Sequence, residues 1–315
     1  YGLGWLRLVP MLLRTWPRLA ETDLVLGINI AFGGVIARLA SPVFYVPYIT
    51  FAYAYEFLKF PKWSPPAWLL RHAHNHAKAV IAISRFTRDN LVGLGVDPAR
   101  IAVVHPGATP APRASRAAVR ATRAYYALGD GPVILAVGRF VPRKGHRTLV
   151  QAMPRVLERA PEAVLVLVGR GPFLQEVVHE AYAQGVREHV LFPGALPDKE
   201  VARLYEACTL FALPTGRDAR GQVEGFGLAF AEAQAHGKPV VGGRSGGVVD
   251  VIRSGETGLL VDPDDPCALA DAVLGLIEHP KRMQTLARQG RKRVESELNW
   301  TQFAAGVLQA AAKRL

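Results

Sequence analysis

The chain of 315 residues is 50% hydrophobic and 20% charged, and it carries a formal net charge of +12. This composition is typical of a globular protein large enough for two domains with their own cores, and it excludes a fibrous or low-complexity chain. Two cysteines, Cys208 and Cys267, are too few for a disulfide framework, so we expect buried thiols in a reducing, cytoplasmic compartment. Residues 1–20 lack the pattern of a signal peptide, so we expect no secretory leader.

Basic residues are densest near the start, where residues 1–110 hold 11 Lys and Arg against 5 Asp and Glu. Residues 1–20 combine three of these arginines with leucines and tryptophans and contain no acidic residue. Such a segment can lie on an anionic membrane surface, or it can pack as a helix on a sheet with its arginines in water. Pro10 and Pro17 interrupt the pattern and favour the second interpretation, and no motif indicates nucleic acid as a partner.

Two uncharged runs follow, at residues 24–37 and 39–55. The second reaches the lower length limit of a membrane-spanning helix, but its two prolines and its Tyr, Phe and Val residues favour strands and turns. We therefore predict buried strands at residues 24–29 and 44–49, with a helix at residues 34–39 between them. His72, His74 and His76 are predicted to lie on a basic surface helix rather than at a metal site.

The rest of the chain alternates strands with helices. Ser84 is predicted to cap a helix at residues 86–94, a strand follows at 101–104, and the prolines of 108–115 indicate a linker before a helix at 116–127. Further strands are predicted near residues 132–137, 163–168, 190–192, 209–213, 239–242 and 258–261. The alternation predicts a parallel, doubly wound sheet, and residues 300–315 are predicted to form a closing amphipathic helix.

A basic turn follows the apolar run at residues 132–137. Gly138, Arg139 and Lys144 lie where open α/β sheets bind ligands, beyond the carboxyl end of a strand. Arginine can bind a phosphate through two hydrogen bonds, and lysine acts as a point charge. The spacing is not that of a Walker loop, and solvated basic side chains remain the alternative interpretation.

Two carboxylates, Glu224 and Glu232, flank a glycine turn that opens into a helix predicted at residues 228–236. The free amides of such a helix start favour anions. A carboxylate beside an anion site is expected to bind neutral hydroxyls, so phosphate next to polyol indicates a nucleotide sugar. A capped helix with a solvated glutamate is equally compatible with this segment alone.

Together these segments resemble glycosyltransferase family 4, whose retaining enzymes have the GT-B fold. The most specific parts are Gly138-Arg139 with Lys144-Gly145, the two glutamates, and Ser245-Gly246-Gly247. The residues around Lys144, with 217–225, look most like the phosphatidylinositol mannosyltransferase subgroup, which uses GDP-mannose. The resemblance implies an α/β protein with two Rossmann-like domains facing a cleft, the first of them apparently truncated.

The implied domains are an acceptor domain at residues 1–107, a linker and helix at 108–128, a nucleotide-sugar domain at 129–298, and a helix at 299–315 that crosses back to the first domain. A family member starts with a strand and a glycine-rich loop, whereas here the match begins near Leu24, so roughly two strand–helix units are expected to be missing. Many members also place a histidine near the reacting sugar, where this chain has residues 53–56.

The resemblance also implies the site residues. Catalytic roles fall to Arg139, Lys144 and Glu224, and Tyr55 lies on the acceptor side. The donor-binding residues are Gly138, Leu196, Gly225, Phe226, Gly227, Leu228 and Glu232. Asp262 and Asp264 are assigned to turn and cap roles, so no metal is implied, and no cofactor beyond a GDP- or UDP-linked sugar donor.

The expected reaction is transfer of a hexose, best matched by mannose from GDP-mannose, to a lipid-linked or glycan acceptor. We expect a cytoplasmic protein, peripheral on the inner face of the membrane if residues 1–20 bind lipid. Three alternatives stay open: a UDP-sugar-dependent glycosyltransferase, a nucleotide-sugar epimerase, and a catalytically silent nucleotide-sugar-binding protein.

Overall fold

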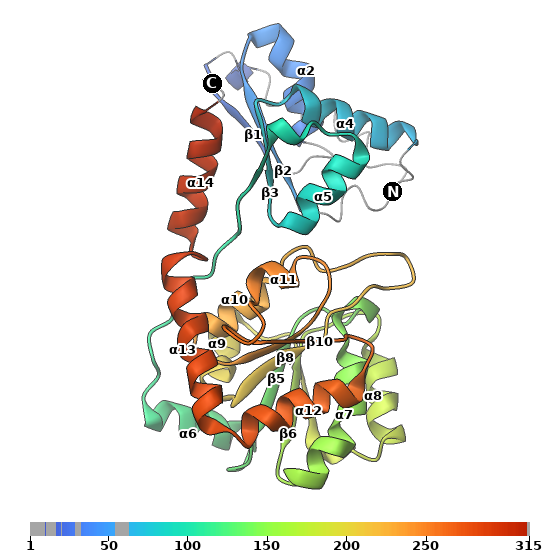
Figure 1. Ribbon diagram of the computed structural model, residues 1–315, viewed down its shortest axis with the longest axis vertical. Coiled ribbons are helices and arrows are strands. Elements are labelled where there is room, and N and C mark those ends of the chain that lie inside the picture. The colour runs from blue at the N-terminus through green and yellow to red at the C-terminus, as the bar shows by residue number, and fades with distance from the viewer. Residues whose placement is uncertain (1–9, 11–16, 20, 29–32, 54–62, 314–315) are drawn as a thin grey trace. The chain divides into compact units, whose positions relative to one another are not determined.

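The computed structural model describes residues 10, 17–19, 21–28, 33–53 and 63–313. The chain divides into two compact units, Tyr1–His105 with Phe303–Leu315, and Pro106–Gln302 (Figure 1). Each unit is built on its own parallel sheet. Within the described residues, no helix combines the length and the apolar character needed to cross a bilayer.

The described part of the first unit forms a four-stranded sheet in the order β1-β2-β3-β4. Its strands are β1 (Val25–Gly27), β2 (Tyr48–Ala52), β3 (Ala79–Ala82) and β4 (Ile101–Val103). Its helices are α2 (Val35–Phe44), α4 (Pro65–His76), α5 (Arg85–Leu94) and α14 (Trp300–Ala312), with a 3-10 turn η3 (Pro98–Arg100) before β4. Alternate residues of β2 and β3 face opposite sides, so Tyr48 and Val80 pack with α2, α4 and α5, whereas Ile49 and Ile81 pack with α14.

The strand predicted at residues 44–49 is wrong in its position. The helix before it continues through Pro42 to Phe44, and Tyr45 ends it with a φ of 55°. All five residues of β2 are buried, so the apolar run shows no alternation that could mark where the strand begins. The strands predicted for β1 and β4 are confirmed, but β1 is not buried as predicted, because Leu26 is 48% exposed. The Ser84 cap is confirmed as well: the Ser84 hydroxyl accepts from the Thr87 amide at 3.1 Å.

Two smaller predictions need correction. His74 does not lie on the surface, because α4 turns it into the core, where its Nδ1 lies 2.9 Å from the Thr50 hydroxyl. His72 and His76 remain on the outer side of that helix. Cys208 is buried, but Cys267 is exposed in the first turn of a helix at the surface of the second unit.

The second unit holds a six-stranded sheet in the order β10-β9-β8-β5-β6-β7. Its strands are β5 (Val133–Val137), β6 (Val164–Val168), β7 (Val190–Gly194), β8 (Leu210–Leu213), β9 (Val240–Gly243) and β10 (Leu259–Val261). These positions confirm the predicted strands to within two residues at each end. All neighbouring strands are parallel, and the strand order reverses between β5 and β8. Ligands of open α/β sheets bind at such a switch point, beyond the carboxyl ends of the strands.

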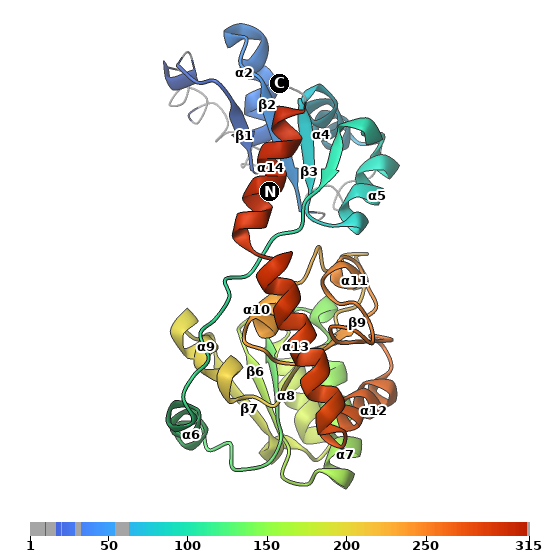
Figure 2. The same cartoon turned by 60° about the vertical axis from the view of Figure 1, so that its left-hand side comes forward.

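Helices cover both faces of this sheet (Figure 2). They are α6 (Arg116–Tyr125), α7 (His146–Arg159), α8 (Leu174–Ala183), α9 (Asp198–Ala207), α10 (Leu228–Ala235), α11 (Val248–Val251), α12 (Pro266–Ile277) and α13 (Pro280–Ser296), with 3-10 turns η4 (Pro142–Lys144) and η5 (Arg187–His189). α7 packs with α8 and α12, whereas α10 packs with α13 and α6 with α9. With right-handed crossovers, α7, α8 and α12 lie on one face of the sheet, and α6, α9, α10 and α13 lie on the other.

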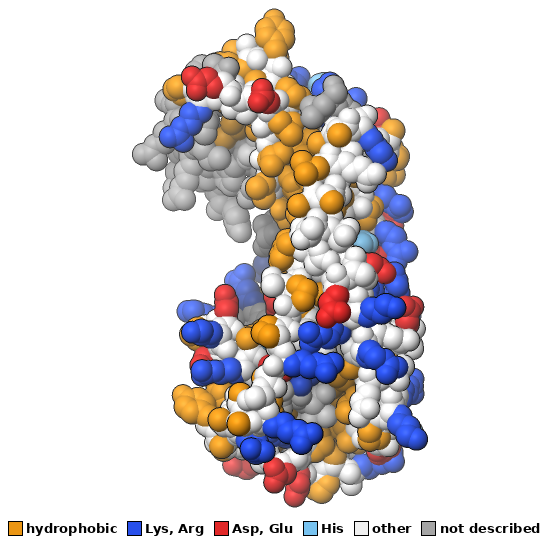
Figure 3. All heavy atoms as spheres, turned by 90° about the vertical axis from the view of Figure 1, so that its left-hand side faces the viewer, with side chains coloured by type: hydrophobic (Ala, Val, Ile, Leu, Met, Phe, Trp, Pro, Cys, Tyr) orange, Lys and Arg blue, Asp and Glu red, His pale blue; other side chains and the backbone are white. Residues whose placement is uncertain are grey.

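The positive charge of the second unit is visible on α13. Lys281, Arg282, Arg288 and Lys292 are exposed on this helix, and Figure 3 shows basic side chains gathered on the surface of the second unit. In the first unit, α14 leaves the apolar side chain of Leu308 68% exposed.

Candidate functional site

The loop between β5 and α7 places the predicted cations. After Gly138 and Arg139 the chain makes the turn η4, in which Pro142 takes the first position, and it enters α7 through Gly145 at a φ of 71°. A side chain at Gly145 would collide with the carbonyl oxygen of Pro214, so glycine is required both by the backbone angle and by this close approach. The β5–α7 loop therefore lies against the segment that follows β8.

The loop between β8 and α10 holds Glu224. The Gly247 amide donates to the Glu224 carbonyl at 2.8 Å, and side chains at Gly246 or Gly247 would collide with the carbonyls of Glu224 and Gly225. The Ser245-Gly246-Gly247 motif thus supports the backbone of Glu224 by close packing. Gly227, at a φ of 99°, then opens α10.

Lys144 and Glu224 meet in an ion pair. The distance from Lys144 Nζ to Glu224 Oε2 is 2.6 Å, and the two side chains are only 14% and 16% exposed. The Lys144 side chain runs beside Gly138, where a side chain would come within 3.7 Å of its Cδ and Cε. Two residues that are 80 positions apart in the chain are therefore brought together beyond the switch point.

A cavity of about 610 Å³ lies at the carboxyl ends of β5, β6 and β7. This volume is within the range of sites for small molecules. Four predicted residues line it together: Gly138, Arg139, Leu196 and Glu232. Its other lining residues are Val137, Val168, Gly169, Arg170, Gly171, Ala195, Asp198 and Val201.

Glu232 lies on the first turns of α10 and is held by a residue that the sequence analysis missed. Its Oε2 accepts a hydrogen bond of 3.0 Å from the Tyr205 hydroxyl of α9. Tyr205 is 2% exposed. Burial, followed by the charge of Glu232 and their hydrogen bond, raises the pKa of Tyr205 well above its ordinary value, so the hydroxyl keeps its proton and remains a donor.

The other predicted residues occupy different places. Gly225, Phe226 and Leu228 flank Glu224 and the start of α10 without lining the cavity; Phe226 is 2% exposed, and Leu228 is 40% exposed. Tyr55 lies outside the described residues. Arg170 and Asp198, which line the cavity, were also missed; the Gly-Arg-Gly turn after a strand was the signal that could have indicated Arg170.

The Asp262–Asp265 turn is held by its own side chains. Asp262 accepts from the Asp264 amide at 3.0 Å, and Asp265 accepts from the Ala268 amide at 2.9 Å and so caps α12. Asp262 therefore takes the predicted turn role, whereas the cap is Asp265 and not Asp264.

Comparison with known proteins identifies the family. The profile described as "Glycosyl transferases group 1" matches residues 121–293, and that described as "Glycosyltransferase Family 4" matches residues 2–111. A GDP-mannose-dependent alpha-(1-6)-phosphatidylinositol monomannoside mannosyltransferase of Mycolicibacterium smegmatis is 36% identical over 233 residues, 73% of this chain and 61% of the relative. A D-inositol 3-phosphate glycosyltransferase of Corynebacterium efficiens is 36% identical over 214 residues, 65% of this chain and 48% of the relative.

Solved structures show the same architecture. The Anabaena protein HepE, determined in complex with UDP and glucose, has a TM-score of 0.84 at 21% identity, over 99% of this chain and 83% of its own. Sucrose-phosphate synthase from Thermosynechococcus elongatus has a TM-score of 0.76 at 26% identity, over 93% of this chain and 74% of its own. The chain spans about three fifths of the length of the mannosyltransferases that it matches. The protein therefore belongs to the group 1 glycosyl transferases and has the GT-B fold.

Proposed function

We propose that the protein is a glycosyltransferase that moves mannose from GDP-mannose to a lipid-linked or glycan acceptor. One observation carries this proposal: the cations and carboxylates of two separate motifs converge beyond the carboxyl ends of β5 and β8. Arg139 and Glu232 line one cavity, and the Lys144–Glu224 pair lies beside its Gly138 wall. A diphosphate flanked by two polyols has the complementary pattern of charge and hydroxyl groups.

The proposed roles follow from charge. Arg139, Lys144 and the amides at the start of α10 bind the diphosphate and stabilise the negative charge that grows on it as the bond to the sugar breaks. Glu224 accepts hydrogen bonds from sugar hydroxyls and Glu232 from ribose hydroxyls. These groups supply the positive charge that a divalent cation supplies in other transferases, so we propose a metal-independent reaction. Retention of the anomeric configuration is proposed from membership of the family.

Asp198 supports guanine as the base. It opens α9 and lines the same cavity as Leu196. Guanine presents two adjacent donors on its pairing edge, N1–H and N2–H, which a carboxylate can accept together, whereas uracil presents one. The names of the mannosyltransferase relatives, which specify GDP-mannose, point the same way.

The test is a comparison of nucleotides in wild type and in Asp198→Asn. We expect GDP and GDP-mannose to raise the melting temperature more than UDP or ADP counterparts at equal concentration. Asp198→Asn should weaken GDP binding by about tenfold or more, because hydrogen bonds to a charged group contribute about 1.5–3 kcal/mol. Asp130→Asn, at an exposed aspartate before β5, is the control. Equal or greater stabilisation by UDP would instead favour the UDP-sugar transferase.

The acceptor is proposed from the relatives, whose names specify a phosphatidylinositol mannoside. Radiolabelled GDP-mannose should yield a mannosylated lipid when vesicles containing phosphatidylinositol monomannoside are present. Release of free sugar and nucleotide without any acceptor would favour the epimerase. Nucleotide-sugar binding without transfer to a panel of lipid and glycan acceptors would favour the binding protein. Sedimentation with anionic but not neutral vesicles would support the proposed peripheral membrane location.

A further inference from the structure

We propose that Tyr205 is the positioning residue for Glu232 and thereby sets a preference for ribonucleotide donors over donors that lack the ribose hydroxyls. The inference rests on the proposed function, because it assumes that Glu232 faces a nucleotide. It assigns a role to a side chain that is not on the cavity wall and that acts only through the carboxylate.

Tyr205 and Glu232 lie on two different helices and are joined by a hydrogen bond. It belongs to α9, and its hydroxyl lies 3.0 Å from Glu232 Oε2 on α10 and 3.3 Å from the Ala229 carbonyl of the same helix. Of the two acceptors, the carboxylate oxygen is closer and charged, so the phenol hydroxyl forms its stronger hydrogen bond with Glu232. Among the described residues, no other side chain donates to Glu232 in the structure.

The Tyr205 ring is itself held on two sides. His236 stacks against it with ring centroids 5.2 Å apart and an angle of 18°, and Phe211 packs on it at 5.8 Å. His236 is in turn fixed by Glu206, whose Oε1 lies 2.6 Å from His236 Nδ1. Packing of this kind restricts the rotamers of the ring, so we expect its hydroxyl to be positioned before any ligand binds.

This arrangement holds one oxygen of Glu232 at the protein while the residue borders the cavity. Oε2 accepts from the phenol, and the carboxylate borders the cavity, so its remaining acceptor sites, among them those of Oε1, are proposed to accept from a ribose hydroxyl. Without the phenol, the glutamate side chain regains rotamer freedom that binding must remove again. The hydroxyl of Tyr205 is therefore expected to affect recognition of the ribose specifically, and recognition of the base and phosphates much less.

The experiment measures dissociation constants of GDP and of 2′,3′-dideoxy-GDP for wild type and Tyr205→Phe. We expect wild type to prefer GDP by about tenfold or more, as for one or two hydrogen bonds to a charged group. Tyr205→Phe should reduce this preference to about threefold or less and leave binding of the dideoxy nucleotide nearly unchanged. A double-mutant cycle with Glu232→Gln completes the test: in that background, Tyr205→Phe should have no further effect on the preference.

Tyr126→Phe is the matched control, because Tyr126 donates to Glu200 at 3.3 Å, another tyrosine–glutamate contact that is not on the cavity wall. It should leave the preference for GDP at the wild-type value. Circular dichroism and the melting temperature of Tyr205→Phe establish that the variant is folded. An unchanged preference in folded Tyr205→Phe overturns the inference. If the wild type binds GDP and 2′,3′-dideoxy-GDP with equal affinity, the inference is also wrong, although nucleotide binding itself is then confirmed. If the wild type binds neither nucleotide, the proposed function is wrong as well.

Discussion

At the scale of single residues, the Lys144–Glu224 pair decides how the site balances its charge. Both side chains are largely buried, and their charged atoms are 2.6 Å apart. Removing one partner of such a pair leaves the other charge poorly compensated. A diphosphate bound at Lys144 would compete with Glu224 for the hydrogen bonds of the ammonium group. The carboxylate could then accept hydrogen bonds from sugar hydroxyls. The pair is therefore a contact that donor binding is expected to rearrange.

Lys144→Ala should abolish transfer without unfolding the protein. Removing one group that stabilises developing charge typically lowers kcat by about 10²–10³-fold, and Lys144 is proposed to bind the donor as well. The measurement is kcat/KM for GDP-mannose, with the melting temperature as the check of folding. Lys281→Ala, at an exposed lysine on α13, is the control. Near-normal turnover in Lys144→Ala would remove this residue from the site.

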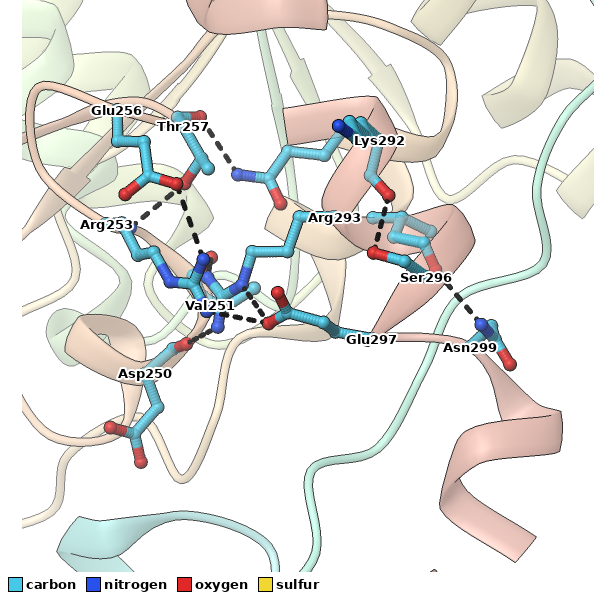
Figure 4. A network of polar contacts seen from close by, with 12 residues as sticks. Asp250, Val251, Arg253, Glu256, Thr257, Lys292, Arg293, Ser296, Glu297 and Asn299 are labelled. Atoms are coloured by element: carbon cyan, nitrogen blue, oxygen red, sulfur yellow. Dashed lines mark hydrogen bonds and ion pairs between the residues drawn. The ribbon is translucent and has the colours of Figure 1, made fainter. Parts of the chain in front are cut away.

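At the scale of elements, the short helix α11 connects the Glu224 loop, between β8 and α10, to α13. Its first turn follows Gly247, whose amide holds the Glu224 carbonyl. Its last turn is closed by Arg293, which is 6% exposed and donates to the carbonyls of Asp250 and Val251 at 2.7 and 2.8 Å. Figure 4 shows this arginine between the helix end and Glu297, to which its Nε also donates at 3.1 Å. One buried guanidinium thus supports the far side of the Glu224 loop.

Arg293→Met should lower the free energy of unfolding by about 2–4 kcal/mol, because two helix-end carbonyls lose their donors in a buried place. It should also weaken GDP-mannose binding, since the support of the Glu224 loop is loosened. Arg253→Met is the matched control: Arg253 bonds the same Glu297 at 2.7 Å, but its side chain is 45% exposed. An exposed pair contributes about 0–1 kcal/mol. The measurement is urea unfolding of the two variants. Equal losses in the free energy of unfolding would contradict this account.

At the scale of the whole molecule, each unit contains one buried, neutral histidine. His74 in the first unit is 0% exposed, and His146 in the second is 1% exposed and stacks on Phe140 at 4.3 Å. Burial lowers the pKa of each from 6.5 to about 3, and for His146 the charge of Lys144 adds to the effect. Below pH 6.5 the unfolded chain therefore binds protons that the folded chain does not bind.

Both units should consequently lose stability between pH 7 and pH 5. Each histidine contributes a slope of about 1.4 kcal/mol per pH unit below its unfolded pKa, or about 2 kcal/mol at pH 5. Glu206 affects stability only in a more acidic range. Burial opposes its ionisation, but hydrogen bonds from His236 and the Ala114 amide leave its pKa below 4.5. Its contribution to stability is therefore lost only below that pH. Urea unfolding of His146→Phe should show a flatter pH dependence in the second unit. His279→Phe, at an exposed histidine, should leave the pH dependence unchanged. If the free energy of unfolding had the same slope against pH in both variants, the pH dependence could not be assigned to His146.

The sequence by itself determined the parts of this protein that depend on neighbours in the chain. The apolar runs of the second unit are bounded by glycines and prolines, so the positions of its strands could be predicted to within two residues. Because residues that follow strands of a parallel sheet or open the next helix meet at one edge, the sequence could predict that Arg139, Lys144 and the two glutamates lie near that edge. The structure pairs Lys144 with Glu224 and places Arg139 and Glu232 on one cavity, and their roles stay a prediction.

Only the tertiary structure decided the rest. The start of β2 could not be predicted because the strand is buried on both faces and its apolar run has no period. Tyr205 and Glu232 are 27 residues apart, and Arg293 and Asp250 are 43 apart, on helices that meet only when the unit is folded. No local pattern marks such partners, since the contact between them depends on how far each helix extends and how it is rotated. Those two quantities are set by the packed core and not by the residues beside either partner.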